Sequence, residues 1–318
     1  PAPPFEAETL YVIGGLYGNL AALDEIERMA AAEPGPVTMV FNGDFNWFNV
    51  GDDGYAEINQ RVLAHRATAG NVEVELVRED RSAGCGCAYP ESVDQATVER
   101  SNAIHARLCA TAARHPALTA RLAALPRFAR CDVGETRVAI VHGDADSLAG
   151  WGFGIDALDD AAMARALPAH FLDADVAVFA CSHTCLPVMR EVALGAGVGL
   201  IANNGAAGMP NFHGERFGVI TRISIHTSPH APLYSTRIGT TRVEALAVRY
   251  DVQRFARGFL ADWPPGSPAH QSYWPRIDHG TALTPADAMP RPAGHAQSVT
   301  ACRTTAGSCK LVPAPAAT

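Results

Sequence analysis

The sequence predicts an α/β fold in which a two-sheet β sandwich is flanked by helices. Short apolar runs alternate with amphipathic helical segments in the first half of the chain, and short strands separated by turn residues fill the second half. With 318 residues and 48% hydrophobic content, the chain is long enough to bury one large core. We expect the apolar runs of the first half to form one sheet and the short strands of the second half to form another.

The elements follow one another in a regular order. In the first half, the expected strands are residues 10–13, 37–41, 67–69, 128–132, 137–141 and 176–180. The expected helices between them are residues 20–30, 55–65, 92–113 and 161–171. Asn19 is placed to cap the first helix, whose apolar face carries Leu23 and Ile26. In the second half, the expected strands are 188–192, 198–202, 217–225, 233–238 and 243–249, before a helix at 252–260.

The domain organisation follows from a change in composition near the C-terminal end. One domain is expected over residues 1–283, with an insert at about residues 74–127. From residue 284 the chain becomes rich in Ala, Pro, Thr and Ser, which bury too little apolar surface to fold. We therefore expect residues 284–318 to be a disordered tail in which Cys302 and Cys309 are loose thiols.

The charge balance argues against nucleic-acid binding. The formal net charge is −8, and Lys310 is the only lysine, whereas binding to a phosphate backbone needs a positive field. No apolar stretch reaches membrane-spanning length, and the first strand begins too early to leave room for a signal peptide. We expect a cytoplasmic protein without membrane contact, whose eight cysteines are reduced. The oligomeric state does not follow from the sequence.

Metal-ligating side chains follow four of the apolar runs. Asp44, Asn71, His142 and His183 each come just after an expected strand. If these strands are parallel members of one sheet, their C-terminal ends lie side by side, where open α/β sheets bind ligands. An Asp, an Asn and two His supply mixed oxygen and nitrogen ligands, which suit Mn, Zn or Fe.

Six segments occur in the same order as the motifs of a known family. They are residues 11–20, 42–44, 70–73, 142–144, 182–185 and 204–210. In this set the chain resembles the calcineurin-like metallophosphoesterases, with Asn-Gly-Asp, Gly-Asn-Val-Glu, His-Gly-Asp and Ser-His-Thr-Cys in place of the family motifs. The resemblance implies the four-layer αββα fold of metallo-dependent phosphatases and a hydrolase of phosphoric esters.

The departures from the family pattern fall on one of its two metal sites. The ligands private to the first metal are replaced by Gly15, Tyr17 and Cys185. The resemblance assigns the second metal to residues that are all present, namely Asp44, Asn71, His142 and His183. It therefore implies a divergent member with a degenerate first metal site and one tightly bound metal per chain.

The residues that act on the substrate also depart from the family. The histidine that would protonate the leaving group is Val72, and an arginine of protein phosphatases falls on Phe48. His213 is a candidate replacement for the proton donor or a surface histidine. Asp144 is a candidate carboxylate behind His142 or a solvated loop residue. No catalytic residue is therefore assigned.

Further residues are candidates for a substrate pocket. Asn46, Trp47 and Phe48 belong to an aromatic stretch that either packs as a loop or stacks on a flat substrate, and Asn204 opens the last motif. Cys85 and Cys87 are too close in sequence for an ordinary disulfide. Their glycine-rich loop is either a tight turn with incidental thiols or a segment that folds over the crevice towards Cys185. Cys181 is expected in the core.

Three functions remain open from the sequence. The first is a metal-dependent phosphoesterase with one metal, acting on a phosphomonoester or diester small molecule or nucleotide. The second is a catalytically silent ligand-binding homologue. The third is a non-hydrolytic metal protein in which Tyr17 and Cys185 supply new ligands, which would suit iron or another soft metal. Turnover of phosphoesters separates the first from the second, and metal content separates the first from the third.

Overall fold

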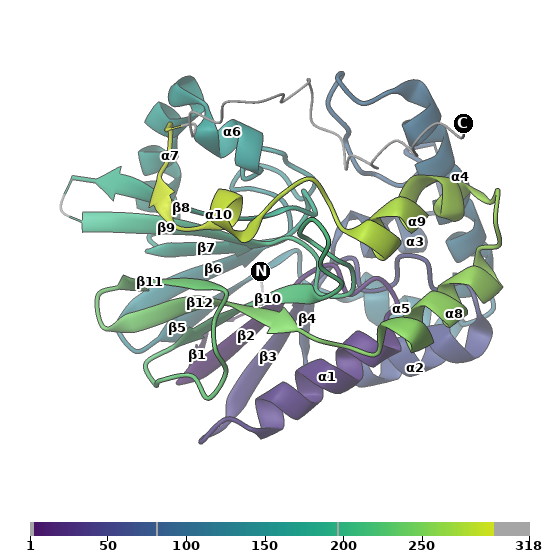
Figure 1. Cartoon of the computed structure of the whole chain (residues 1–318), viewed down its shortest axis with the longest axis horizontal. Coiled ribbons are helices and arrows are strands. Elements are labelled where there is room, and N and C mark those ends of the chain that lie inside the picture. Colours follow the sequence, from purple (N-terminus) through teal and green to yellow (C-terminus); the bar gives the residue numbers. More distant parts are fainter. Residues whose placement is uncertain (1–2, 81, 196, 296–318) are drawn as a thin grey trace.

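Two β-sheets stacked face to face form the centre of the molecule. The computed structural model describes residues 3–80, 82–195 and 197–295. Helices α6 (Ile155–Asp159) and α7 (Ala161–Ala174) lie beyond one sheet, and α1 (Leu20–Ala31) lies beyond the other (Figure 1). The predicted two-sheet sandwich flanked by helices is therefore confirmed.

The first sheet has six strands in the order β11-β12-β10-β2-β3-β4. Its parallel part comes from the start of the chain and consists of β2 (Thr9–Ile13), β3 (Val37–Asn42) and β4 (Arg66–Thr68). Its antiparallel part comes from the end and consists of β10 (Gly218–Ser224), β11 (Tyr234–Ile238) and β12 (Thr241–Val248).

The second sheet has seven strands in the order β1-β5-β6-β7-β9-β8-β13. They are β1 (Phe5–Ala7), β5 (Phe128–Val133), β6 (Thr136–Val141), β7 (Val178–Cys181), β8 (Pro187–Leu194), β9 (Gly197–Asn204) and β13 (Arg291–Pro292). The hairpin of β5 and β6 was predicted, and β7 runs parallel to β6 on one side and to β9 on the other.

The predicted division of strands between the two sheets was wrong. The four apolar runs that precede the ligand candidates belong to different sheets, because β3 and β4 lie in one and β6 and β7 in the other. The five short strands of the second half also divide, since β8 and β9 pair with β7 whereas β10 to β12 extend from β2. Apolar runs show that a strand exists but do not identify its neighbour, which is set by side-chain packing far along the chain.

The helices gather on the outer faces and beside one end of the sheets. The predicted helices appear as α1, α2 (Asp52–Val62), α4 (Gln95–Ala112), α7 and α8 (Val252–Asp262), and Asn19 caps α1 through a 3.0 Å bond from the amide of Ala22. Five further helices of the described residues were not predicted: α3 (Asn71–Val77), α5 (Pro116–Ala123), α6, α9 (Pro268–His279) and the short α10 (Pro285–Ala288). None of the helices in the described ranges is long and apolar enough to cross a membrane.

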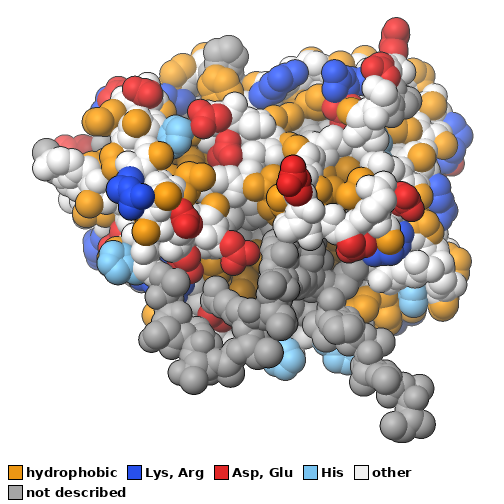
Figure 2. All heavy atoms as spheres, turned by 90° about the horizontal axis from the view of Figure 1, so that it is seen from above, with side chains coloured by type: hydrophobic (Ala, Val, Ile, Leu, Met, Phe, Trp, Pro, Cys, Tyr) orange, Lys and Arg blue, Asp and Glu red, His pale blue; other side chains and the backbone are white. Residues whose placement is uncertain are grey.

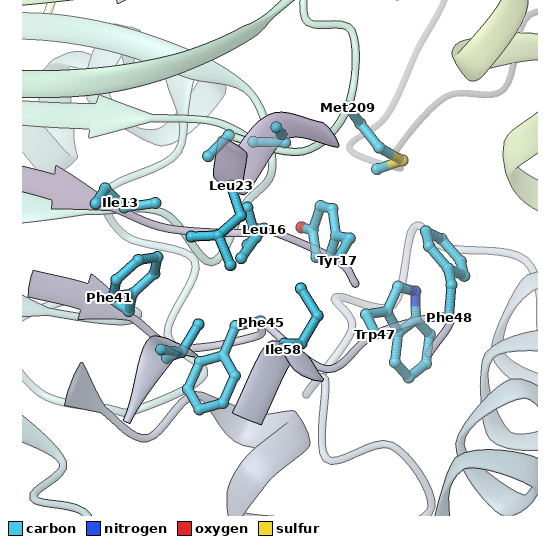
Figure 3. Close-up of a cluster of buried hydrophobic side chains, with 14 of the residues drawn as sticks. Ile13, Leu16, Tyr17, Leu23, Phe41, Phe45, Trp47, Phe48, Ile58 and Met209 are labelled. Atoms are coloured by element: carbon cyan, nitrogen blue, oxygen red, sulfur yellow. The ribbon is translucent and has the colours of Figure 1, made fainter. Parts of the chain in front are cut away.

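Strand β2 shows how the core is divided. Leu10 and Val12 point into the apolar layer between the two sheets, whereas Tyr11 and Ile13 point to the layer under the helices. All four are at most 1% exposed, as expected for a central strand covered on both faces. The layer under the helices continues to the loops beyond the strand ends, where Tyr17, Trp47 and Phe48 are packed (Figure 3).

Part of the predicted tail is folded. Residues 285–288 form the short helix α10 (Pro285–Ala288), and β13 adds to the edge of β8. Ala288 is fully buried and Arg291 pairs with Asp159. The prediction of disorder was therefore wrong for 284–295, because buried Ala288, the ion pair of Arg291 and several hydrogen bonds to the backbone of this segment together dock it on the fold. The rest of the expected tail, with Cys302 and Cys309, lies outside the described residues.

Acidic and basic side chains are mixed on one face of the molecule. On the face seen in Figure 2, the basic side chains are dispersed among acidic ones and are not gathered into a stripe. That distribution offers no continuous track for a phosphate backbone on this face.

Candidate metal centre

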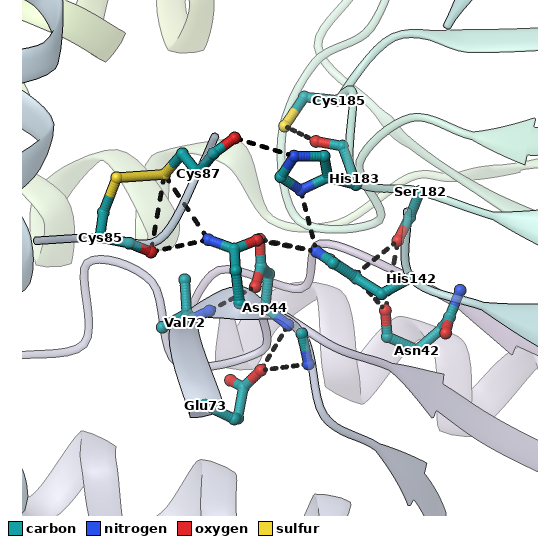
Figure 4. Close-up of polar contacts among 12 residues, drawn as sticks. Asn42, Asp44, Val72, Glu73, Cys85, Cys87, His142, Ser182, His183 and Cys185 are labelled. Carbon is teal, nitrogen blue, oxygen red and sulfur yellow. Dashed lines mark hydrogen bonds and ion pairs between the residues drawn. A yellow bond between two sulfur atoms is a disulfide. The ribbon is translucent and has the colours of Figure 1, made fainter. Parts of the chain in front are cut away.

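The two sheets bring the four candidate ligands to one point. Asp44 follows β3, Asn71 begins α3 just after β4, His142 follows β6, and His183 comes shortly after β7. The strands of both sheets end on the same side of the sandwich, so side chains from both sheets converge there (Figure 4). Each of the four is at most 6% exposed.

Their polar atoms are spaced as the donors of one small site. Nε2 of His142 lies 3.2 Å from a carboxylate oxygen of Asp44, 3.1 Å from the amide oxygen of Asn71 and 3.2 Å from Nδ1 of His183. Among the described residues, Asp44, His142 and His183 form the one group of acidic, histidine or cysteine side chains that is close enough to hold a metal ion.

Each of the two histidines has one ring nitrogen hydrogen-bonded away from the centre. The lone pair of its other ring nitrogen is thereby directed at the centre. Nδ1 of His142 lies 2.9 Å from the carbonyl oxygen of Asn42, and Nε2 of His183 lies 3.2 Å from that of Cys87. A carbonyl only accepts, so the proton of each neutral ring sits on the outer nitrogen. The inner nitrogens then face two oxygens with no proton between them, an arrangement that a divalent cation satisfies.

The electrostatics of the metal-free site point the same way. Burial opposes charge on His142, but the adjacent carboxylate of Asp44 outweighs it and raises the pKa of His142. Burial and the neighbouring His142 lower the pKa of His183 to about 4. A positive charge beside the buried Asp44 carboxylate is therefore favourable, and a divalent cation would supply it.

The remaining ligands are oriented by the backbone around them. One oxygen of Asp44 accepts from the amide of Val72 at 3.1 Å, and Glu73 accepts from the amides of Asp44 and Gly70 at 2.7 and 3.1 Å. The amide nitrogen of Asn71 donates to the carbonyl of Cys85 at 2.9 Å, which turns its oxygen inwards. Glu73 was not predicted as a site residue, although it stands in the Gly-Asn-Val-Glu segment.

Two catalytic candidates from the sequence do not lie at this centre. Asp144 accepts from the amides of Asp146, Ser147 and Gly152, so its carboxylate shapes a loop. The group behind His142 is instead the carbonyl of Asn42, with which Nδ1 is hydrogen-bonded. His213 is exposed, and its backbone amide bonds to the carbonyl of Leu283.

The three positions of the degenerate first site lie together. The hydroxyl of Tyr17 is 2.7 Å from the sulfur of Cys185. A Cβ at Gly15 would lie 3.0 Å from the Tyr17 ring, so that ring fills the space in front of the glycine. Tyr17 and Cys185 have positive φ angles of 53° and 59°, which few side chains adopt outside functional or tightly packed turns.

The prediction that Cys85 and Cys87 cannot pair was wrong. The structure joins them in a disulfide, so the expectation that every cysteine is reduced also fails for this pair. Gly84 and Gly86 have φ angles of 59° and 65°, which curl the backbone so that the two sulfurs meet. The free cysteine Cys181 is buried, as predicted.

The cysteine loop folds over the centre, as one of the two predicted alternatives proposed, but its two sulfurs are bonded to each other and it offers no thiol to Cys185. The carbonyl of Cys87 accepts from His183 and, at 3.1 Å, from the indole of Trp151. The carbonyl of Cys85 accepts from the side chain of Asn71 at 2.9 Å, so two backbone carbonyls of the loop fix it to the site (Figure 4). Trp151 lies in the loop that follows His142, and nothing in its sequence position marked it as a site residue.

Most of the aromatic stretch is packed. Asn46 is buried against Asn59 and Glu73, and Phe48 meets the ring of Tyr273 edge-on at 4.7 Å. Trp47 alone of the three lines the cavity over the centre. Asn204 is buried and donates to the carbonyls of Gly14 and Val219 at 3.0 and 2.8 Å, so it ties strands together.

A small cavity of about 30 Å³ adjoins the centre. Its lining contains three of the candidate ligands, the Tyr17–Cys185 pair and several aromatic rings: Asp44, Asn71, His183, Tyr17, Cys185, Val72, Cys87, Trp47, Tyr89, Trp151 and Tyr273. A cavity of this size holds about one water molecule. Larger ligands therefore need the covering loop to shift.

We expect Gly70→Ala to weaken metal binding about 10- to 100-fold, as loss of a group that orients a ligand does. An added Cβ would lie 2.3 Å from a carboxylate oxygen of Asp44 and 2.9 Å from His142, so both candidate ligands would move. Gly197→Ala is the matched control, because nothing lies within 4 Å of its Cβ position. Metal titration of both variants tests this, and equal affinities would contradict it.

No protein-family model matches the sequence, and no curated protein matches it. Among solved structures, a metallophosphoesterase from Sphaerobacter thermophilus superposes with a TM-score of 0.54 and 16% identity, covering 86% of this chain and 100% of that one. A hypothetical protein from Pyrococcus horikoshii OT3 gives 0.53 and 13%, covering 86% and 99%. The chain therefore has the calcineurin-like metallophosphoesterase fold, as predicted. At these identities the likeness establishes the fold alone.

Proposed function

We propose that this protein is a metal-dependent phosphoesterase that works with one divalent cation, Mn, Zn or Fe. The observation that carries the proposal is the convergence of Asp44, Asn71, His142 and His183, whose inner donor atoms lie about one ligand spacing apart. A carboxylate, an amide oxygen and two imidazoles suit these metals better than Mg.

The chain's own residues would bind and aim the cation. A divalent cation held by these residues would lower the pKa of a water molecule and polarise a phosphoryl oxygen. In hydrolysis the oxygen of water joins phosphorus, the ester P–O bond breaks, and the leaving oxygen takes up a proton. Val72, at the position of the family's proton donor, contributes only its backbone amide to Asp44. Substrates with poor leaving groups should therefore react slowly, since general acid catalysis is typically worth about 10²–10⁴-fold.

The proposed substrate is a small phosphomonoester or diester, or a nucleotide, and not a phosphoprotein. Phe48 stands where protein phosphatases hold an arginine, and its ring is packed against Tyr273 and Phe259. The cavity beside the centre is small and partly covered by the Cys85–Cys87 loop. Both features favour a compact ligand over a folded protein chain.

A substrate panel tests the proposal. We expect protein loaded with Mn or Zn to hydrolyse p-nitrophenyl phosphate or its bis-ester, to act more slowly on dinucleotide polyphosphates and to leave a phosphopeptide intact. Asp44→Asn should lose at least about 100-fold in rate, because the carboxylate is the one charged ligand. Activity that survives in Asp44→Asn would come from a contaminant or another site, and rapid phosphopeptide turnover would refute the substrate class.

A catalytically silent ligand-binding protein is the second candidate. It is favoured by the small size of the cavity and by Val72, which leaves the position of the proton donor apolar. Metal binding without turnover on any member of the panel would support it. The third possibility, with Tyr17 and Cys185 as metal ligands, gains no support, because Cys185 is not in the described group that could hold a metal.

A further inference from the structure

The degenerate half of the site presents a hydroxyl to the cavity in the place of a second cation. Tyr17 and Cys185 line the same cavity as Asp44, Asn71 and His183. The Tyr17 ring occupies the space in front of Gly15, where the family's opening aspartate would extend towards a metal ion. What remains beside the proposed cation is one phenol and one thiol.

In the hydrogen bond between Tyr17 and Cys185, the phenol of Tyr17 is the donor. The thiol of Cys185 donates to the carbonyl of His183 at 3.2 Å (Figure 4). Its sulfur is then the partner that accepts from the hydroxyl of Tyr17 at 2.7 Å. Sulfur is a weak acceptor, so the phenol gains by exchanging it for a charged phosphoryl oxygen.

The charges around the cavity favour a ligand that carries a single negative charge. A divalent cation bound by Asp44, one neutral Asn and two neutral His leaves a net charge of about one positive unit. None of the described residues that line the cavity is Lys or Arg. Arg276 lies behind it, buried and donating to the carbonyl of Cys185 at 2.8 Å. A second negative charge would therefore sit unpaired among aromatic rings, which is costly.

We propose that the Tyr17 hydroxyl donates a hydrogen bond to a non-bridging phosphoryl oxygen, and that the site consequently prefers a phosphodiester monoanion to a phosphomonoester dianion. This inference rests on the proposed function, because it assumes a cation held by the four ligands. It gives Tyr17, which replaces a ligand of the family's first metal, a role in binding the substrate.

Ligand binding tests the inference without relying on turnover. Diphenyl phosphate and phenyl phosphate are titrated calorimetrically at pH 8 into the Mn-loaded wild type, Tyr17→Phe, Cys185→Ala and Tyr89→Phe, and the metal content of each is measured. Tyr89→Phe is the matched control, since Tyr89 lines the same cavity but its hydroxyl bonds to Ser101 at 2.9 Å. Melting temperatures verify that all variants are folded.

In the wild type we expect diphenyl phosphate to bind more tightly than phenyl phosphate. Tyr17→Phe should weaken diphenyl phosphate binding about 10- to 100-fold, the usual worth of a hydrogen bond to a charged group, with unchanged metal content. Cys185→Ala and Tyr89→Phe should bind within about threefold of the wild type, less than the loss of one such bond.

Three results would overturn the inference: tighter binding of phenyl phosphate, unchanged binding in Tyr17→Phe, or loss of metal in Tyr17→Phe. The proposed function fails separately. If neither ester is hydrolysed but the binding pattern holds, the protein is a silent binder and the role of Tyr17 stands. If the wild type holds no metal, both proposals are wrong.

Discussion

Purified His183→Ala protein is expected to lose nearly all of its bound divalent metal. In the proposed site His183 would supply one of four donors, and among the described residues no carboxylate, histidine or thiol other than those of Asp44, His142 and His183 belongs to the group that could hold a metal. Loss of a group that only orients a ligand typically lowers metal affinity about 10- to 100-fold, and loss of the ligand itself should lower it further. We therefore expect affinity to fall by at least about 100-fold, measured by elemental analysis and by competition with a chelator.

A control substitution tests whether the loss of metal is specific to His183 or follows from removing any histidine. His213→Ala removes an exposed imidazole away from the cavity lining, so it should retain the wild-type metal content of about one ion per chain, the stoichiometry of a single four-ligand site. Wild-type protein with two tightly held ions would refute the one-metal site. Unchanged occupancy in His183→Ala would show that the metal is bound elsewhere.

Local patterns predicted most elements but not their assembly. The apolar run before Asp44 and the cap at Asn19 depend on neighbours in sequence, and both β3 and α1 appear where expected. Strand β7 pairs instead with β9, although β8 lies between them in the sequence. No local sequence period encodes that choice of neighbour. Helix α9 was missed because Pro268 and Pro275 mask it; the first opens the helix and the second lies within it.

The site was predictable where chemistry requires particular residue types. Carboxylate, amide and imidazole side chains just after strands are visible in the sequence, and the structure brings all four of these candidate ligands together. Of its aromatic cover, Trp47 was among the predicted pocket candidates, but Trp151 and Tyr89 were not, because they reach the cavity from loops whose course is set by tertiary packing. The Cys85–Cys87 bridge was missed for a related reason, since it needs two glycines with positive φ.

A buried ion network centred on Arg222 of β10 should contribute strongly to stability. The guanidinium of Arg222 bonds to Glu33 at 2.7 and 2.9 Å and to Glu244 at 2.7 Å, and Tyr11 donates to Glu33 at 2.7 Å. The side chains of Arg222 and Glu33 are fully buried. One cation thus neutralises two carboxylates that have left water, and its removal would leave both uncompensated.

We expect Arg222→Ala to lower the free energy of unfolding at pH 7 by about 3–5 kcal/mol, the usual cost of breaking a buried pair. Arg28→Ala is the matched control, because Arg28 pairs with Glu25 on the surface with 66% of its side chain exposed. Such an exposed pair contributes roughly 0–1 kcal/mol. Urea denaturation of both variants measures the difference, and equal losses would contradict a special role for the buried network.

The loss in Arg222→Ala should also shrink in acid. Burial alone would raise the pKa of Glu33, but Arg222 and Tyr11 outweigh it and hold that pKa below the ordinary value of 4.5. In the wild type, this pairing therefore stabilises the fold above about pH 4.5 and is lost as the pH falls through the folded-state pKa. Without Arg222, burial should raise the pKa of Glu33, so protonation would stabilise the variant as the pH falls. The difference in unfolding free energy between wild type and variant should thus be larger at pH 7 than at pH 4. A difference that does not change with pH would show that Glu33 does not titrate as this network requires.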